Sequence, residues 1–262
     1  MTGLPVIAEM PSLPKNQRHS TDGPAGALPR PRAAERYREV RTAVMFVLHE
    51  HLSTPNAGQA PVVMITSPNP GEGKTTTVAN LAGVFGSGGM RTLVIDCDYR
   101  KPAVAKYLAP VPDLDHPDQP AVTRLDEVWF IPAPRGSGGP ADMVMRLRHT
   151  FEDWRGRFDM VLLDTPPILT TNDTTDLLAA ADTVVLVLRA GQTRKGQAER
   201  AANVLLRYRA DVLGIVLNAS NSNDMDPYYD DYNNEESPRS WGGKDSATRA
   251  RPVAGPSSTP VD

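Results

Sequence analysis

The chain of 262 residues has little cysteine and no excess of positive charge. Its single cysteine, Cys97, cannot form an internal disulfide, and the five histidines show no metal-ligand spacing with it. The 28 basic and 31 acidic residues give a net charge of −3, so no overall positive field draws the molecule toward nucleic acid. These absences favour a reducing, cytoplasmic setting and argue against a nucleic-acid partner.

Long apolar runs are also missing. No stretch approaches the ~18–20 consecutive apolar residues of a membrane-spanning helix. The N-terminus lacks a charged segment followed by an apolar signal core. We therefore expect any membrane association to come through a partner.

Composition divides the chain into three parts. Residues 1–32 contain six prolines and little apolar periodicity, which predicts a disordered or extended tether. Residues 33–220 have the length and patterning of one α/β domain, beginning with an amphipathic helix over 33–52. Residues 221–262 open with six acidic residues and no Lys or Arg between Asn221 and Ser237, which predicts a disordered acidic tail.

Apolar strands alternate with helical segments in the central part. The predicted strands are Val62–Thr66, Thr92–Asp96, Met160–Asp164, Thr183–Leu188 and Leu213–Asn218, with a shorter apolar run at Val128–Ile131. The predicted helices beyond residue 52 are Lys74–Phe85, Ala141–Trp154, Asp173–Ala180 and Arg194–Tyr208. Strands that are apolar throughout suit a sheet covered on both faces. The predicted fold is therefore α/β, with a doubly wound, mostly parallel sheet.

A phosphate-binding loop follows the first of these strands, in the run SPNPGEGKTT from Ser67 to Thr76. Its glycines let backbone N–H groups surround phosphate oxygens, and the next helix adds its positive N-terminus. Lys74 would reach the β- and γ-phosphates and Thr75 would ligate Mg²⁺. The general pattern G-x-x-x-x-G-K-[ST] has glycine where this chain has Pro68. The predicted ATP-binding residues are Pro70, Gly71, Glu72, Gly73, Lys74, Thr75, Thr76 and Asn218.

Carboxylates end two further strands, at Asp96, Asp98 and Asp164. The carboxyl ends of parallel strands meet at one edge of a sheet, where ligands bind. Each aspartate alone could be a helix N-cap or a turn residue, but together behind a phosphate loop they indicate one Mg²⁺–ATP site. The predicted metal ligands are Thr75, Asp98 and Asp164, and the predicted catalytic residues are Lys74, Asp96, Asp98 and Asp164.

These motifs together resemble the bacterial tyrosine kinases that regulate capsule and exopolysaccharide synthesis. Ile65–Thr75, Val94–Pro102 and Asp164–Pro167 resemble the Walker A, Walker A′ and Walker B motifs of that family. The related division-site and chromosome-partitioning ATPases, of the MinD/ParA type, carry a signature lysine where this chain has Asn69. That difference favours the kinase branch of these deviant Walker P-loop NTPases. The resemblance covers roughly residues 33–235.

The first helix and the tail add two features to the resemblance. Glu35, Arg38 and Arg41 match the family's E-x-x-R-x-x-R pattern, whose helical spacing predicts one shared face. As a bare charge pattern this is a solvated helix face, but the resemblance implies a ring-shaped homo-oligomer built on it.

The tail carries the acceptor residues that the resemblance implies. Tyr228, Tyr229 and Tyr232 are three of the seven tyrosines, and they resemble the family's C-terminal tyrosine cluster. A disordered acidic segment has no core for these rings to fill. We therefore expect the chain to phosphorylate this cluster, with one copy acting on the tail of another.

The resemblance further implies ATP and Mg²⁺ as cofactors, a transmembrane polysaccharide co-polymerase as activator and a cognate tyrosine phosphatase. We expect Asp96 to accept or orient the tyrosine proton, with Asp98 assisting at the metal. Gly3–Pro11 also looks like the segment after the second membrane span in fused kinases. The chain is then either free-standing or part of a longer kinase at the inner face of the plasma membrane.

Two observations limit the resemblance. The run Pro132–Pro140 stands in place of the family's usual turn rich in proline and asparagine, and the segment before it looks shortened.

The alternative function is a non-kinase, MinD/ParA-like ATPase switch or scaffold at a membrane polysaccharide assembly. Asn69 and the tail tyrosines argue against that alternative.

Overall fold

The computed structural model describes residues 2–12, 31–52, 59–111, 119–133 and 154–220. The tail from residue 221 onward lies outside the described residues, as does the helix predicted for Ala141–Trp154 except for its last residue.

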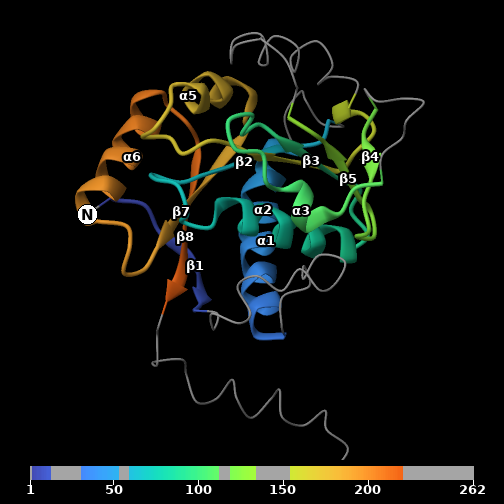
Figure 1. The fold of residues 1–262 in the computed structure, drawn as a ribbon, viewed down its shortest axis with the longest axis horizontal. Helices are drawn as coiled ribbons and strands as arrows, with labels where there is room; N and C mark the ends of the chain where they lie inside the picture. The colour runs from blue at the N-terminus through green and yellow to red at the C-terminus, as the bar shows by residue number, and fades with distance from the viewer. Residues whose placement is uncertain (1, 13–30, 53–58, 112–118, 134–153, 221–262) are drawn as a thin grey trace, which may run out of the picture. The chain divides into compact units, whose positions relative to one another are not determined.

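One eight-stranded sheet organises the described residues (Figure 1). Its order is β1-β8-β7-β2-β6-β3-β5-β4, and every neighbouring pair is parallel except β4 and β5. The strands are β1 (Val6–Pro11), β2 (Val62–Thr66), β3 (Thr92–Asp96), β4 (Ala121–Val122), β5 (Val128–Ile131), β6 (Met160–Asp164), β7 (Thr183–Arg189) and β8 (Val212–Ser220). The predicted doubly wound, mostly parallel α/β fold is confirmed.

Helices cover both faces of this sheet. They are α1 (Pro31–Leu52), α2 (Lys74–Ser87), α3 (Ala105–Leu108), α5 (Asp173–Leu177), the 3₁₀ helix η3 (Leu178–Ala180) and α6 (Lys195–Arg207). The first three pack on one face and the last three on the other (Figure 1). Alternate strand residues serve the two cores, so that Val63 contributes to the α1–α2 side and Met64 to the α5–α6 side.

The central strands bring their carboxyl ends to one edge. Every residue of β2, β3 and β6 is buried, as expected for apolar strands with helices on both faces. In the parallel ladders Asp164 lies opposite Ile65 on one side and opposite Asp96 on the other. The phosphate loop and two of the predicted aspartates therefore meet at the same edge.

The N-terminal segment differs from its prediction. Residues 1–32 were expected to lack regular structure, but Val6–Pro11 forms β1 and pairs in parallel with β8 at the sheet edge. Ala8 and Met10 of this strand are buried in the core on the α1–α2 side. A strand of six residues flanked by prolines gives little periodic signal, and only its long-range pairing stabilises it.

Helix α1 has the apolar face that its periodicity predicts. Tyr37, Val40, Val44 and Leu48 are buried against the sheet and α2. The helix begins at Pro31, slightly before its predicted start, and proline suits the first turn because its missing N–H has no partner there. No helix among the described residues is long and apolar enough to cross a membrane.

Candidate active site

The loop between β2 and α2 has the backbone of an anion site. Gly71 and Gly73 adopt φ values of 80° and 102°, which side chains disfavour. A Cβ atom on Gly73 would also stand 2.2 Å from the amide nitrogen of Asn218. Helix α2 has no side-chain cap at this end, so its first N–H groups are available to a bound anion.

Lys74 begins α2 and already has a carboxylate partner. Its Nζ lies 3.3 Å from Oδ2 of Asp98, and both side chains are largely buried. The other carboxylate oxygen of Asp98 accepts a hydrogen bond from the Lys101 amide at 3.0 Å. Asp98 therefore stands between the loop lysine and its own turn.

Asp96 and Asp164 are buried without enough hydrogen-bond donors. Oδ1 of Asp96 accepts from the Asp98 amide at 3.0 Å, but its Oδ2 and both oxygens of Asp164 have no partner in hydrogen-bonding geometry. Burial raises the pKa of both carboxyls by more than nearby donors lower it, which are the Thr75 hydroxyl for Asp164 and the Ala103 and Val104 amides for Asp96. Burial raises the pKa of Asp96 to about 6, and the neighbouring Asp98 charge adds to this. Burial likewise raises the pKa of Asp164 to about 7, although the positive charge of Lys74 opposes the shift. Such carboxylates would gain from a cation.

The residues at this edge fit a magnesium–nucleotide complex. No group of three or more His, Cys, Asp or Glu side chains in the described part of the chain forms a ready-made metal cage. Mg²⁺ usually keeps several waters and binds one or two carboxylates together with the substrate's phosphates. The unpaired oxygens of Asp164, next to Asp98 and the partly exposed Thr75, meet that requirement.

A network of hydrogen bonds braces the phosphate loop. The buried carboxylate of Glu72 accepts from the Asn69 amide at 2.7 Å and from the Thr193 hydroxyl at 2.6 Å. Asn69 in turn accepts from Gln197 of α6 at 3.4 Å. Asn218 donates to the Glu72 carbonyl at 3.0 Å. Thr193 and Gln197 were not predicted, because each meets the loop across more than 120 residues of sequence.

The carbonyl groups of two predicted nucleotide-binding residues accept hydrogen bonds from side chains of the same chain. The carbonyl of Thr76 accepts from the Asn80 side chain at 2.8 Å, and that of Pro70 accepts from Gln192 at 3.4 Å.

The buried Cys97 separates Asp96 from Asp98, and burial raises its thiol pKa well above the usual range. This cysteine is therefore a packing residue rather than a nucleophile.

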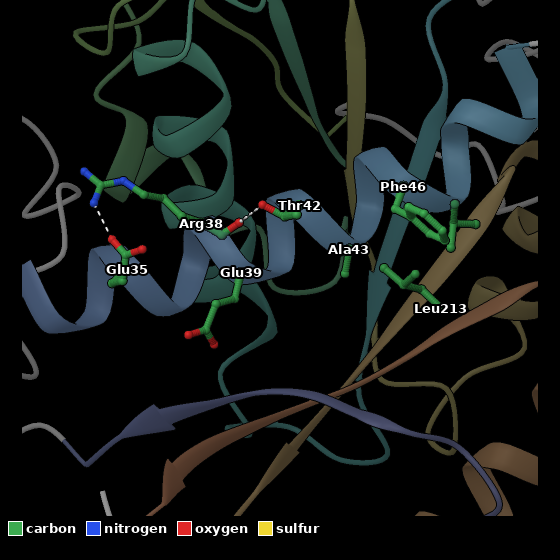
Figure 2. A pocket seen from close by; sticks show the side chains of 8 residues that line it. Glu35, Arg38, Glu39, Thr42, Ala43, Phe46 and Leu213 are labelled. Carbon is green, nitrogen blue, oxygen red and sulfur yellow. Dashed lines mark hydrogen bonds and ion pairs between the residues drawn. The ribbon is translucent and has the colours of Figure 1, made fainter. Parts of the chain in front are cut away.

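The charged residues of α1 do not share one face. Glu35 and Arg38 are exposed and form an ion pair with each other (Figure 2). Arg41 turns instead toward α2, where its Nη1 donates to the Val84 carbonyl at 3.1 Å. An α-helix advances about 100° per residue, so six residues leave Arg41 about 120° away from Glu35. The prediction of one shared face is wrong for Arg41.

An open groove accompanies the outer side of α1 (Figure 2). Phe46 lines it with 77% of its surface exposed, and Leu213 of β8 forms part of the opposite side. The predicted contact between copies remains a prediction for Glu35, Arg38 and Arg41. The predicted acceptors Tyr228, Tyr229 and Tyr232 lie outside the described residues.

Comparison with known sequences identifies the family. Residues 63–244 match the model of the CobQ/CobB/MinD/ParA nucleotide-binding domain. The tyrosine-protein kinase YwqD of Bacillus subtilis (strain 168) is 34% identical over 200 residues, which cover 71% of this chain and 80% of YwqD. The putative tyrosine-protein kinase EpsB of Ralstonia nicotianae is 31% identical over 201 residues, covering 72% of this chain but 26% of EpsB. The chain thus spans most of YwqD and about a quarter of EpsB.

Solved structures give the same result for the fold. The BceF tyrosine kinase domain matches with a TM-score of 0.68 and 29% identity, covering 82% of this chain and 93% of that domain. The kinase domain of the Escherichia coli tyrosine kinase ETK, at 22% identity, matches in fold with a TM-score of 0.67 over 82% of this chain and 90% of that domain. The chain belongs to the CobQ/CobB/MinD/ParA nucleotide-binding family and, within it, to the bacterial tyrosine-protein kinases.

Proposed function

We propose that this kinase uses Mg²⁺ and ATP to phosphorylate Tyr228, Tyr229 and Tyr232 in the tail of a neighbouring copy of the same chain. The observation that carries the phosphoryl-transfer part is the buried pair of Asp96 and Asp164, whose oxygens lack partners beside Lys74 and the phosphate loop. Phosphoryl transfer needs positioning and neutralisation of charge more than covalent chemistry.

The phosphate loop and the metal ligands have separate roles in this proposal. The loop amides and Lys74 hold the phosphates, while Thr75, Asp98 and Asp164 hold Mg²⁺ directly or through water. Mg²⁺ would supply charge neutralisation at the transferred group. Lys74 would then have two partners in turn. It pairs with Asp98 in the nucleotide-free chain and would contact the phosphates once ATP is bound. Its ammonium group would help keep the metal carboxylates ionised.

Asp96 is the proposed acceptor or orienting group for the tyrosine proton. A phenol with a pKa of about 10 is not ionised at neutral pH, so a carboxylate beside its hydroxyl assists attack. With a pKa of about 6, Asp96 is mainly ionised above neutrality and is a stronger base than an ordinary aspartate. Its unpaired Oδ2 leaves one acceptor oxygen for a substrate hydroxyl.

The alternative, a non-kinase ATPase switch, has less support. Such relatives carry their signature lysine at the position of Asn69. Here Asn69 donates from both its amides to the buried Glu72 and accepts from Gln197. Its side chain is therefore engaged within its own chain. Hydrolysis of ATP without phosphotyrosine would favour the alternative.

The cellular context of the proposal comes from the resemblance. We infer regulation of capsular or exopolysaccharide synthesis and export, with a transmembrane polysaccharide co-polymerase as activator and a tyrosine phosphatase as antagonist. The chain would act at the inner face of the plasma membrane through such a partner or a fused segment. A ring of copies that uses Glu35 and Arg38 of α1 would bring each tail to a neighbouring site.

Incubating the purified full chain with Mg²⁺–ATP tests the kinase activity. Mass spectrometry should find phosphotyrosine at the three tail positions, and replacing all three tyrosines by phenylalanine should remove it. The Lys74→Met variant should lose activity by about 100-fold or more yet keep a cooperative unfolding transition, at a temperature lowered by the loss of its contact with Asp98. Normal phosphotyrosine in Lys74→Met would contradict the proposed site.

Mixing two variants tests transfer between copies. The Lys74→Met chain serves as acceptor, and an active chain with Tyr228, Tyr229 and Tyr232 changed to Phe serves as donor. Phosphotyrosine on the acceptor is expected, because the tail tyrosines lie about ten residues beyond β8 and reach up to ~33 Å when extended. An acceptor that stays unmodified at every protein concentration would mean transfer within one chain.

Light scattering tests the proposed contact between copies. A variant with Glu35→Ala and Arg38→Ala should have a lower average molecular mass in solution than the unchanged chain.

A further inference from the structure

Asp173 is a buried aspartate that the proposed chemistry does not use. It begins α5, and only 4% of its surface is exposed. Its carboxylate accepts a hydrogen bond from the Tyr99 hydroxyl. It also accepts from Nε of Arg100 at 2.8 Å. Both donors, Tyr99 and Arg100, belong to the turn that follows Asp98.

The Tyr99–Arg100 turn is directly connected to the aspartates of the site. The Asp98 amide donates to Oδ1 of Asp96 at 3.0 Å, and Oδ2 of Asp98 faces Lys74 at 3.3 Å. Tyr99 and Arg100 are the next two residues, so any movement of their backbone would carry Asp98 with it. Asp173 therefore holds the two residues after Asp98, while Lys74 contacts Asp98 itself.

A second set of bonds ties Asp173 to the loop that follows Asp164. The hydroxyl of Thr174 donates to the Pro166 carbonyl at 2.7 Å. The same carbonyl accepts from Thr66 at the end of β2, at 3.1 Å. The start of α5 is thus fixed to the segment two residues beyond Asp164. Through Asp173, this fixed point reaches the turn that carries Asp98.

The chemistry of the contact suits orientation better than stabilisation. A buried carboxylate must be compensated by donors, and well-packed apolar residues often stabilise a fold at least as well. Burial pushes the pKa of Asp173 upward, but the hydrogen bonds from Arg100 and Tyr99 outweigh it, so the pKa lies below the usual range. The guanidinium of Arg100 also lies 5.5 Å from the centre of the Tyr99 ring. Asp173 is thus a fixed anion with two directed donors.

We propose that Asp173 is a positioning residue that holds Asp98 in place relative to Asp164 through Tyr99 and Arg100. The inference rests on the proposed function, because it assigns these aspartates to the magnesium–nucleotide complex. Loss of the carboxylate would let the Tyr99–Arg100 turn move. The site would then bind Mg²⁺–nucleotide more weakly and transfer phosphoryl groups more slowly.

The test compares Asp173→Asn, Arg100→Gln and their double variant in the full chain. Binding of Mg²⁺ with a fluorescent ADP analogue and phosphotyrosine formation are both measured across Mg²⁺ concentrations. We expect Asp173→Asn to need about tenfold more Mg²⁺ for half-maximal binding, in line with losses typical for residues that orient metal ligands. The double variant should need little more Mg²⁺ than Asp173→Asn, since both changes break the same contact. Arg100→Lys should need less Mg²⁺ than Arg100→Gln, because lysine keeps a positive charge near Asp173.

Asp159→Asn is the control for removing an aspartate–arginine contact, because Asp159 pairs with Arg91 at the surface, away from the site. Its Mg²⁺ requirement should equal that of the unchanged protein. An unchanged Mg²⁺ requirement in Asp173→Asn and in Arg100→Gln would overturn the proposal, as would a loss that merely follows a lowered unfolding temperature. If Asp173→Asn does not fold, Tyr99→Phe with Arg100→Gln removes both donors instead and must raise the requirement.

The nucleotide-binding measurement separates this proposal from the proposed function. A protein that binds Mg²⁺–ADP but forms no phosphotyrosine would contradict the kinase assignment of the tail. The Mg²⁺ requirement of Asp173→Asn would still decide the role of Asp173. Weaker binding in that variant supports the positioning role, and unchanged binding rejects it.

Discussion

Among the aspartates buried near the carboxyl edge of the sheet, Asp96 and Asp164 differ from Asp173, and Asp98 has partners in Lys74 and the Lys101 amide. Asp96 and Asp164, at the ends of β3 and β6, have oxygens without hydrogen-bond partners and pKa values raised to about 6 and about 7. Asp173, at the start of α5, is similarly buried, but Tyr99 and Arg100 donate to it and its pKa is lowered. Burial is common to Asp96, Asp164 and Asp173, and the supply of donors separates them.

The contrast shows what a buried carboxylate does to the fold when its donors are present and when they are missing. A buried carboxylate with its donors in place is complete in the folded chain, and changing it leaves donors unsatisfied. A buried carboxylate without donors weakens the fold until a cation arrives. Asp96 and Asp164 thus lower the stability of the nucleotide-free protein and raise its affinity for a cation. Four changes can break or sharpen this comparison.

The largest effect is expected from Asp164→Asn. Activity should fall by about 100-fold or more, because the amide cannot give Mg²⁺ a full negative charge. The free energy of unfolding of the nucleotide-free protein should instead rise at pH 8, by about 1–4 kcal/mol. The folded pKa of about 7 lies above the ordinary 3.8, so this carboxylate destabilises the fold progressively as pH rises from 4 to 7.

Denaturant unfolding at pH 5 and pH 8 measures this gain. The free energy of unfolding of the variant should exceed that of the unchanged protein more at pH 8 than at pH 5, since Asp164 ionises over that range only in the unchanged protein, whereas Asp96 ionises in both. A variant that is less stable at both pH values would mean that the carboxylate of Asp164 already has a partner in the folded chain.

The pH dependence of magnesium binding is the second effect. Mg²⁺ needs ionised ligands, so Asp164 must lose its proton on binding when the pH lies near its pKa of about 7. A single group with this pKa makes the affinity for Mg²⁺–ADP about tenfold weaker at pH 6 than at pH 8. Calorimetry in two buffers of different ionisation enthalpy counts the released protons. Asp164→Asn corrects for titration of the nucleotide, and equal proton release in both proteins would refute the assignment.

Thr193→Val turns a satisfied carboxylate into an incompletely satisfied one. Glu72 would lose the hydroxyl donor now at 2.6 Å while the shape of the side chain is nearly conserved. The free energy of unfolding should fall by about 1–2 kcal/mol, and nucleotide should bind more weakly because the phosphate loop loses a brace. Thr42→Val, at an exposed hydroxyl of α1, is the control and should change stability by less than about 0.5 kcal/mol. Equal effects in both variants would argue against a role for Glu72 burial.

The smallest effect is expected from Asp159→Asn. Asp159 has good partners in Arg91, at 2.8 Å, but its side chain is 38% exposed. Exposed ion pairs contribute about 0–1 kcal/mol, and added salt should reduce even that. A loss above about 2 kcal/mol in thermal or denaturant unfolding would mean that donors matter as much at the surface as in the interior.

Much of this edge could be predicted from local patterns. The apolar run of β2, the glycines of the loop and Lys74 lie within a few residues of one another, so their order alone indicates a phosphate site. Asp96 and Asp164 follow apolar strands whose parallel pairing brings them opposite each other. These signals are local or periodic, which is why they could be found without coordinates.

The remaining residues of the site depend on single contacts between distant segments. Asp173 meets Arg100 across 73 residues, and Thr193 meets Glu72 across 121. No periodicity marks such pairs in the sequence. Arg41 was assigned to the wrong side of α1 because a spacing of three residues drifts around a helix, and its inward turn depends on a carbonyl of α2. Pairing with β8 likewise makes a strand of β1, whose residues alone predict none.

The position of β1 has a consequence for folding on the ribosome. Among the described strands, β1 leaves the exit tunnel before all others, yet Val6 pairs with Ile215 of β8. At about 5–20 residues per second, roughly 10–40 s of synthesis separate the two strands, so Ala8 and Met10 emerge long before their partner does. Closure of this edge is thus a late, non-local step, of the kind that slows folding. Until it occurs, the growing chain carries an unpaired apolar strand that a chaperone or a second nascent chain could bind.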